Sequence, residues 1–373
     1  MFKRTVILVF IFFASICCAK ENLLDSLENT FAKSTHDTLK AKNYLNLAKK
    51  LFYKDRAVAL ICLERVKLVY KKRSLEKLNS QEQFSLESSW GNYYKLMAAH
   101  FQLNSDYNRA VGLNKIALEI FTRIKNKKGI SEILMNLGII ESALGQYAEA
   151  ATDFEKSKLL KIEIKDEDGL AKLNSKLGNL YLFKGEYEKA LTCYTQSHNY
   201  YLKSDNTKEL GIVKAYLGNV YKEKGDYKKA VDYYYNSILL SEKAEDHVNI
   251  MDVNNNLATI YFNQNNFEKA NEYFHRALQQ VNPKSKAALA SIYGNIGSIH
   301  IERKNYDSAT IYFKKALSLN EEVNDKAGLA VMNEKLAILY YYDKKYNEAI
   351  KYFESALKFS KEIGDVTNEC SVL

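Results

Sequence analysis

Residues 177–197 read LGNLYLFKGEYEKALTCYTQS, and residues 217–237 read LGNVYKEKGDYKKAVDYYYNS. Both stretches carry a Leu-Gly pair, a tyrosine, a glycine followed by an acidic residue and a tyrosine, an alanine, another tyrosine and a serine at equivalent places. The first apolar residues stand at i, i+1 and i+4, and after a short break Ala, Tyr and Ser stand at i, i+4 and i+7, which are spacings of one helix face. The pattern therefore predicts two helices joined by a short turn.

This pattern recurs along most of the chain. Its first two residues are Leu137-Gly138, Leu177-Gly178, Leu217-Gly218, Leu257-Ala258, Ile296-Gly297 and Leu336-Ala337, with spacings of 40, 40, 40, 39 and 40. A further step of 40 residues towards the N-terminus finds Met97-Ala98, and a degenerate first unit surrounds Leu47-Ala48. One helix pair cannot bury both of its faces, so the pairs are expected to stack on one another.

The composition is that of a nearly all-helical chain. Among 373 residues there are one Pro and 15 Gly, the two residue types that interrupt helices. Apolar residues make up 47% of the chain, which excludes a disordered protein. The Gly and Cys contents exclude collagen-like and disulfide-scaffold classes.

The L-G-x-x-Y…A-x-x-x-F pattern resembles the tetratricopeptide repeat (TPR), a helix-turn-helix unit of about 34 residues. The resemblance covers about residues 35–364, and the period of about 40 residues is typical of the long-period members of the family. Six extra residues per unit, such as 164–169, would lengthen the helices by about a turn. The resemblance implies an all-α fold, a right-handed α-solenoid (superhelix) of about eight helix-turn-helix units, whose first helices line a concave surface.

The N-terminus has the layout of an export signal. Lys3 and Arg4 are followed by an uninterrupted stretch of apolar and small residues over 6–16 and by small residues before a cleavage position after Ala19. By register, the chain is divided as follows: 1–19 signal peptide, 20–34 lead-in helix, 35–364 repeat array, and 365–373 a short tail or the start of a further helix.

The localisation predicted from this signal is periplasmic or secreted. A lipid-anchored form through Cys17 or Cys18 is the alternative, although Ile16 and Cys17 fit poorly with the small residue that a lipoprotein signal prefers before its cysteine. No later stretch of 18 apolar residues occurs, so no transmembrane span is expected in the mature chain. The sequence leaves the oligomeric state open.

No catalytic constellation is found. The sequence has no G-x-S-x-G elbow, P-loop, H-E-x-x-H motif or dinucleotide fingerprint, and its six histidines lack metal-ligand spacing. We therefore predict a protein that is not an enzyme, with no cofactor and no metal. His300 takes the place of Tyr181, Tyr221 and Tyr261 in other units and is interpreted as a packing replacement. The net charge of +9 is mild, and lysines interleave with acids, which argues against nucleic-acid binding.

The candidate functional surface is the side lined by the first helices. The residues just before and just after each Leu-Gly pair fall on this side, and several are asparagines, whose amides can pair with an extended peptide backbone. By the resemblance to repeat proteins with asparagine ladders, the predicted peptide groove comprises Asn136, Asn179, Asn219, Asn256 and Asn295, with Lys176, Lys214 and Lys335 favouring an acidic partner or a C-terminal carboxylate. Asparagine is abundant throughout the chain, so a solvated helix face without a ligand is the alternative.

The predicted function is that of an exported, non-enzymatic TPR scaffold or adaptor that binds a protein or an extended peptide segment. The alternative is a sensory domain of a truncated or split signal-transduction protein, of the histidine kinase or transcriptional regulator type. This alternative comes from the resemblance alone, because family members of this kind often precede such outputs.

Overall fold

The helices lie where the repeat predicts them. The computed structural model describes residues 37–283 and 285–363, so the predicted signal peptide, lead-in helix and C-terminal tail lie outside the described residues. Over the described residues there are sixteen helices and no strand. The helices are α2 (Asp37–Leu51), α3 (Arg56–Arg73), α4 (Ser80–Leu103), α5 (Tyr107–Arg123), α6 (Lys127–Ala143), α7 (Tyr147–Glu163), α8 (Glu167–Phe183), α9 (Tyr187–Lys203), α10 (Thr207–Glu223), α11 (Tyr227–Lys243), α12 (His247–Asn263), α13 (Phe267–Gln280), α14 (Lys286–Glu302), α15 (Tyr306–Val323), α16 (Lys326–Tyr342) and α17 (Tyr346–Ile363).

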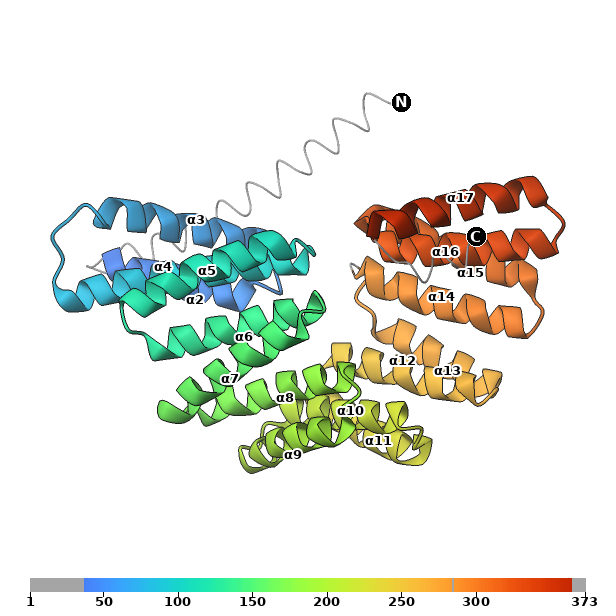
Figure 1. Cartoon of the computed structure of the whole chain (residues 1–373), viewed down its shortest axis with the longest axis horizontal. Coiled ribbons are helices and arrows are strands. Elements are labelled where there is room, and N and C mark those ends of the chain that lie inside the picture. Colours follow the sequence, from blue (N-terminus) through green and yellow to red (C-terminus); the bar gives the residue numbers. More distant parts are fainter. Residues whose placement is uncertain (1–36, 284, 364–373) are drawn as a thin grey trace, which may run out of the picture. The chain divides into compact units, whose positions relative to one another are not determined.

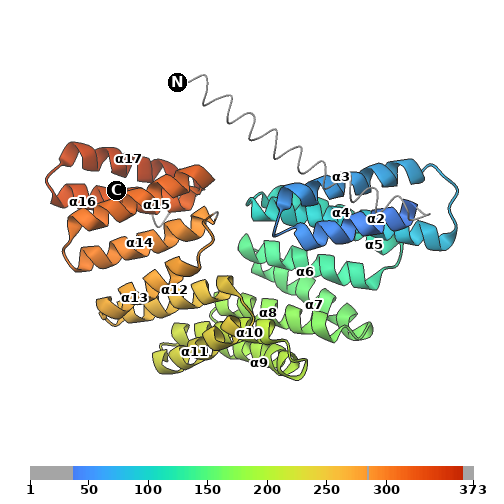
Figure 2. The ribbon, with the colours of Figure 1, turned by 180° about the vertical axis from the view of Figure 1, so that it is seen from behind.

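The chain divides into two compact units between Leu180 and Tyr181. In the first unit α2 pairs with α3, α4 with α5 and α6 with α7; in the second α10 pairs with α11, α12 with α13, α14 with α15 and α16 with α17. Figure 1 and the view from behind in Figure 2 show the two helices of each pair side by side. Within a unit each pair packs on the next, as α11 does on α12. The predicted all-α fold of stacked helix-turn-helix units, an α-solenoid, is confirmed.

Short turns with left-handed backbone residues end the helices. Gly145, Gly185 and Gly225 have positive φ angles, 77° at Gly225, which glycine adopts without steric cost. The next helix is then capped by a side chain: Asp226 accepts the backbone N–H of Lys229 at 3.2 Å. Most helices have 17 residues. Two such helices together with their turns need more than the 34 residues of a shorter repeat.

Glycines within the first helices allow the two helices of a pair to approach each other closely. A Cβ atom added at Gly218 would lie 2.6 Å from the Tyr234 ring, and one added at Gly138 would lie 2.7 Å from the Phe154 ring. Tyr234 is 0% exposed and belongs to the core cluster of the second unit, together with Val253 of the next pair. The repeated Gly-aromatic-Ala pattern is therefore the packing contact of the fold.

A ring pair repeats beside this contact in the second unit. Tyr221 stacks on Tyr233 and Tyr340 on Tyr352, with centroids 5.4 and 5.3 Å apart. His300 stacks on Tyr312 in the same way, at 5.3 Å and 12° between the planes. The interpretation of His300 as a packing replacement is confirmed.

The junction of α7 and α8 in the first unit holds a buried ion pair. The Lys161 side chain is 1% exposed, and its Nζ lies 3.4 Å from Oδ2 of Asp166. Asp166 also accepts the backbone N–H of Gly169 at 3.1 Å, which caps α8. A Cβ at Gly169 would lie 2.0 Å from the Asp166 carboxylate, so a larger residue there would displace this carboxylate from its present position. The junction residues of the long period thus form a defined polar contact.

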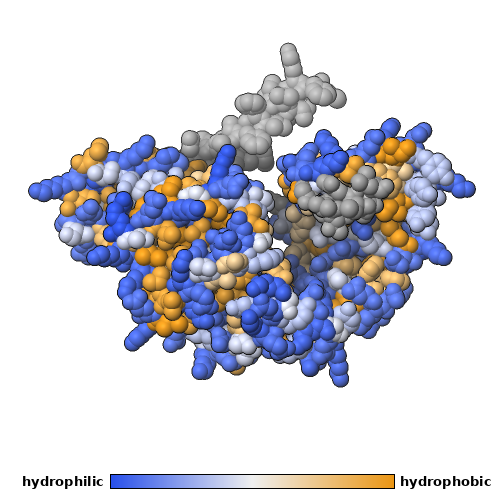
Figure 3. All heavy atoms as spheres, viewed as in Figure 1, coloured by the Kyte–Doolittle hydropathy of each residue, from blue (hydrophilic) through white to orange (hydrophobic). Residues whose placement is uncertain are grey.

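The surface mixes hydrophilic and hydrophobic residues, as the face in Figure 3 shows. Among the helices of the described residues, none combines the length and the apolar character needed to cross a membrane.

Candidate functional site

A hollow of about 400 Å³ lies between α10 and α12, the first helices of two neighbouring pairs in the second unit. Apolar residues such as Ala215 and Val253 line part of it. Its polar lining consists of Tyr216, Asn219, Asn249, Asp252, Asn255 and Asn256, with Asp246 at the start of α12. The repeat explains this convergence. The residues just before and just after a Leu-Gly pair are three positions apart, and a helix makes one turn every 3.6 residues, so both lie on one strip of the first helix.

Two predicted groove residues meet in this hollow. Asn256 Nδ2 donates to Asn219 Oδ1 at 3.2 Å, and the Tyr234 hydroxyl donates to the same oxygen at 2.6 Å. Lys222 Nζ donates to Asn256 Oδ1 at 3.5 Å. Both amide oxygens therefore accept hydrogen bonds, whereas the Asn219 NH₂ group has no acceptor among the described residues. That group can donate to the carbonyl of a bound chain.

The amide contacts continue to the next pair. Asn295 Nδ2 on α14 donates to Asn255 Oδ1 on α12 at 3.2 Å. Asn255 lines the hollow and had not been predicted as a groove residue. Three successive first helices of the second unit, α10, α12 and α14, thus carry asparagines in contact with one another.

The remaining predicted residues are not brought into this hollow. Asn136 on α6, and Lys176 and Asn179 on α8, are half-buried residues of the first unit. Lys214 on α10 places its Nζ 5.9 Å from the centre of the Tyr233 ring, on the side of its own second helix. Lys335 on α16 places its Nζ 5.8 Å from the Phe313 ring centre.

Carboxylates, rather than lysines, line the hollow. Asp246 is 6% exposed; it accepts the backbone N–H of Asn249 at 3.4 Å and lies 3.6 Å from Lys208 Nζ. Asp252 is accessible to solvent and has no hydrogen bond or ion pair with another described residue. Partial desolvation by the surrounding atoms raises the pKa of Asp252, and the charge of Asp246 raises it further.

Asp252 is the functional candidate that the sequence reasoning missed. It stands four residues before Asn256, one helical turn away on the same strip. The signal that could have found it is this i, i+4 spacing from a residue already assigned to the groove.

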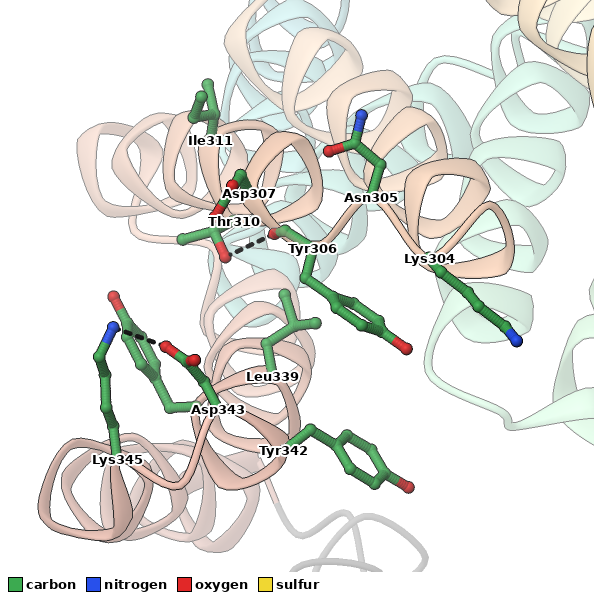
Figure 4. A pocket seen from close by; sticks show the side chains of 11 residues that line it. Lys304, Asn305, Tyr306, Asp307, Thr310, Ile311, Leu339, Tyr342, Asp343 and Lys345 are labelled. Atoms are coloured by element: carbon green, nitrogen blue, oxygen red, sulfur yellow. Dashed lines mark hydrogen bonds and ion pairs between the residues drawn. The ribbon is translucent and has the colours of Figure 1, made fainter.

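A second hollow of about 710 Å³ lies at the turns that join α14 to α15 and α16 to α17 (Figure 4). Its lining includes Leu339, Tyr306 and Tyr342, and Tyr342 is 70% exposed. Several polar groups there already have local partners, since Lys345 pairs with Asp343 at 2.5 Å and the Thr310 hydroxyl donates to the Tyr306 carbonyl at 2.9 Å. We therefore regard the α10–α12 hollow as the stronger candidate. No group of His, Cys, Asp and Glu in the described ranges is arranged to hold a metal ion.

Comparison with protein families gives one result. A family model described as tetratricopeptide repeat matches residues 129–203, 209–281 and 288–362, together more than half of the chain. A search of curated proteins finds no match.

Solved structures with a similar fold have low sequence identity to this chain. A Rap protein complexed with Competence and Sporulation Factor is 12% identical with a TM-score of 0.59, over 88% of this chain and 99% of that chain. Aspartyl phosphate phosphatase F from Bacillus subtilis is 14% identical with a TM-score of 0.51, over 90% and 96%. The apo form of the quorum sensor NprR from B. thuringiensis is 13% identical with a TM-score of 0.51, over 89% and 99%. At these identities the likeness concerns the fold alone.

Proposed function

Because this chain belongs to the tetratricopeptide repeat family, we propose that it is an exported, non-enzymatic scaffold or adaptor that binds an extended segment of a protein or peptide in the α10–α12 hollow. The observation that carries this proposal is the convergence of Asn219, Asn255 and Asn256 in one hollow. The Rap protein complexed with Competence and Sporulation Factor supports it, as a similar fold that holds a partner. No feature of the residues described favours the sensory-domain alternative.

The binding mode follows from the hydrogen-bonding groups. An extended segment exposes one N–H and one C=O per residue, and these must find partners when they leave water. The Asn219 NH₂ group would donate to a carbonyl of the segment, and the side chains of Asn255 and Asn256 lie beside it in the same hollow. Amides in such a row form hydrogen bonds with the peptide backbone, so any preference for particular peptide side chains has to come from other groups.

The first test removes the amides from the hollow. In the double variant Asn219→Ala, Asn256→Ala, peptides selected from an arrayed random library on the unaltered protein should bind about 10- to 30-fold more weakly, because each lost hydrogen bond contributes about 1 kcal/mol. Fluorescence polarisation with labelled peptides measures the change.

The matched control changes two asparagines outside the hollow. Asn199 and Asn236 are exposed residues of the second helices α9 and α11, and their double replacement by alanine should leave peptide affinity unchanged. If no library peptide binds the protein, or if both double variants bind peptides equally well, the proposed function is wrong.

The export proposed here is supported by the signal-like composition of residues 1–19. Full-length protein expressed in a Gram-negative host should appear in the periplasm or the medium, whereas a chain that starts at Met followed by residue 20 should stay in the cytoplasm. Immunoblots of cell fractions measure this. Equal distribution of the two chains would remove export from the proposal and leave peptide binding standing.

A further inference from the structure

We propose that the α10–α12 hollow selects a segment with a lysine or arginine side chain, and that Asp252 is the ionic partner of this cation. The inference rests on the proposed function and adds a specificity to it. It differs from the acidic partner that the sequence predicts from Lys176, Lys214 and Lys335, none of which lines this hollow.

The charge of the hollow supports a cationic ligand. Its lining contains two carboxylates, Asp246 and Asp252, and no lysine or arginine. The two cations that lie near its ends are already engaged: Lys208 lies beside Asp246, and Lys222 pairs with Glu223 at 3.3 Å and donates to Asn256. Asp252 is left without a counter-ion among the described residues, and an unpaired carboxylate in such surroundings favours an added cation.

The shape and the other lining residues suit a long cationic side chain. Ile212 and Val248, the accessible apolar residues of the lining, offer surface to the methylene stem of a lysine or arginine, whose charged head stays near polar groups. The Tyr216 ring lies on the same lining and can take the cation over its face. A volume of about 400 Å³ exceeds that of a single side chain, so the adjoining backbone also fits beside Asn219 and Asn256.

The three groups therefore have separate roles. Asn219 would hold the backbone, Ile212 and Val248 would cover the stem, and Asp252 would determine the charge preference. Removing the carboxylate should abolish the charge preference without abolishing the binding of the backbone.

The experiment compares four versions of one library-selected peptide that differ at one position, with Lys, Arg, norleucine or Glu. The unaltered protein should bind the Lys and Arg versions at least about tenfold more tightly than the norleucine and Glu versions. In Asp252→Asn the Lys and norleucine versions should bind equally, and in Asp252→Lys the Glu version should bind most tightly. Calorimetric titration gives the dissociation constants, and circular dichroism confirms that each variant is folded.

The control and the contrary outcomes keep this inference separate from the proposed function. Asp232→Asn, at an exposed position of α11, should leave all four affinities unchanged. Two outcomes overturn the inference and leave the proposed function intact. One is a preference for Lys that survives Asp252→Asn; the other is the absence of any such preference in a protein whose peptide binding depends on Asn219 and Asn256. Failure of every peptide to bind overturns both.

Discussion

Replacing Tyr234 by alanine should lower the free energy of unfolding of the second unit by about 3–5 kcal/mol, the range for truncating a large buried aromatic side chain. The Tyr234 side chain is completely buried between Gly218 of its own pair and the core residues of the next, so its removal leaves a cavity in the contact that repeats throughout the fold. Urea unfolding followed by circular dichroism at 222 nm measures the loss.

The matched variant is Tyr234→Phe. Phe154, Phe274 and Phe313 occupy the same position in other pairs, so the ring itself is compatible with the site. Only the hydrogen bond to Asn219 is lost, and the cost should be about 1 kcal/mol. If Tyr234→Ala and Tyr234→Phe unfold at the same urea concentration, the assigned packing position of this ring is wrong.

Replacing Lys161 by alanine should cost the first unit about 2–3 kcal/mol. Breaking a fully buried ion pair costs about 3–5 kcal/mol, and the smaller value is expected because the Asp166 side chain stays 20% exposed. The variant removes the ammonium and leaves the Asp166 carboxylate at the α7–α8 junction without it. Thermal unfolding of the variant and the parent at several pH values measures the effect.

The pH dependence of this loss follows from Asp166. Burial alone would raise its pKa, but the Gly169 N–H and the Lys161 ammonium hold the pKa of Asp166 below its usual range. The stabilisation it contributes is therefore present above the unfolded pKa of about 3.9 and is lost as the pH falls through the lower folded value. The difference between parent and Lys161→Ala should be constant above about pH 5 and shrink on further acidification.

The control for this change is Lys158→Ala on the same helix. Lys158 is partly exposed and lies 3.7 Å from Glu155, a surface pair of the kind that contributes little. Its replacement should change stability by less than about 0.5 kcal/mol at every pH. A Lys161→Ala variant as stable as Lys158→Ala would contradict the structural role assigned to the buried pair.

The 40-residue spacing was sufficient to predict the helix pairs and their short turns, because each is fixed by local residue types that recur. The buried pair at Lys161 could not be predicted in the same way. Other pairs place Phe121 and Tyr201 at the equivalent position, and a lysine there looks like a surface residue until the neighbouring Asp166 is seen to face it.

The candidate site was predictable in part. Asn219 and Asn256 were assigned to one surface and lie in contact. Lys214 was assigned to the same surface. It stands three residues before Leu217, and at that position α10 faces its partner helix α11, so the Lys214 ammonium lies over the Tyr233 ring. Asp252 is not among the predicted residues because it stands five residues before Leu257, whereas the predicted asparagines lie next to the Leu-Gly positions; the hollow extends one turn further along α12.

The hydroxyl of Tyr234 joins the interior of the second unit to its candidate binding surface. The ring is held by packing, and through the 2.6 Å hydrogen bond it fixes the Asn219 side chain. Ordering a free amide side chain costs conformational entropy on binding, and here folding has already ordered it. The hollow is therefore preorganised, and the contribution of Asn219 to the affinity for a bound segment depends on the stability of the packing between α10 and α11.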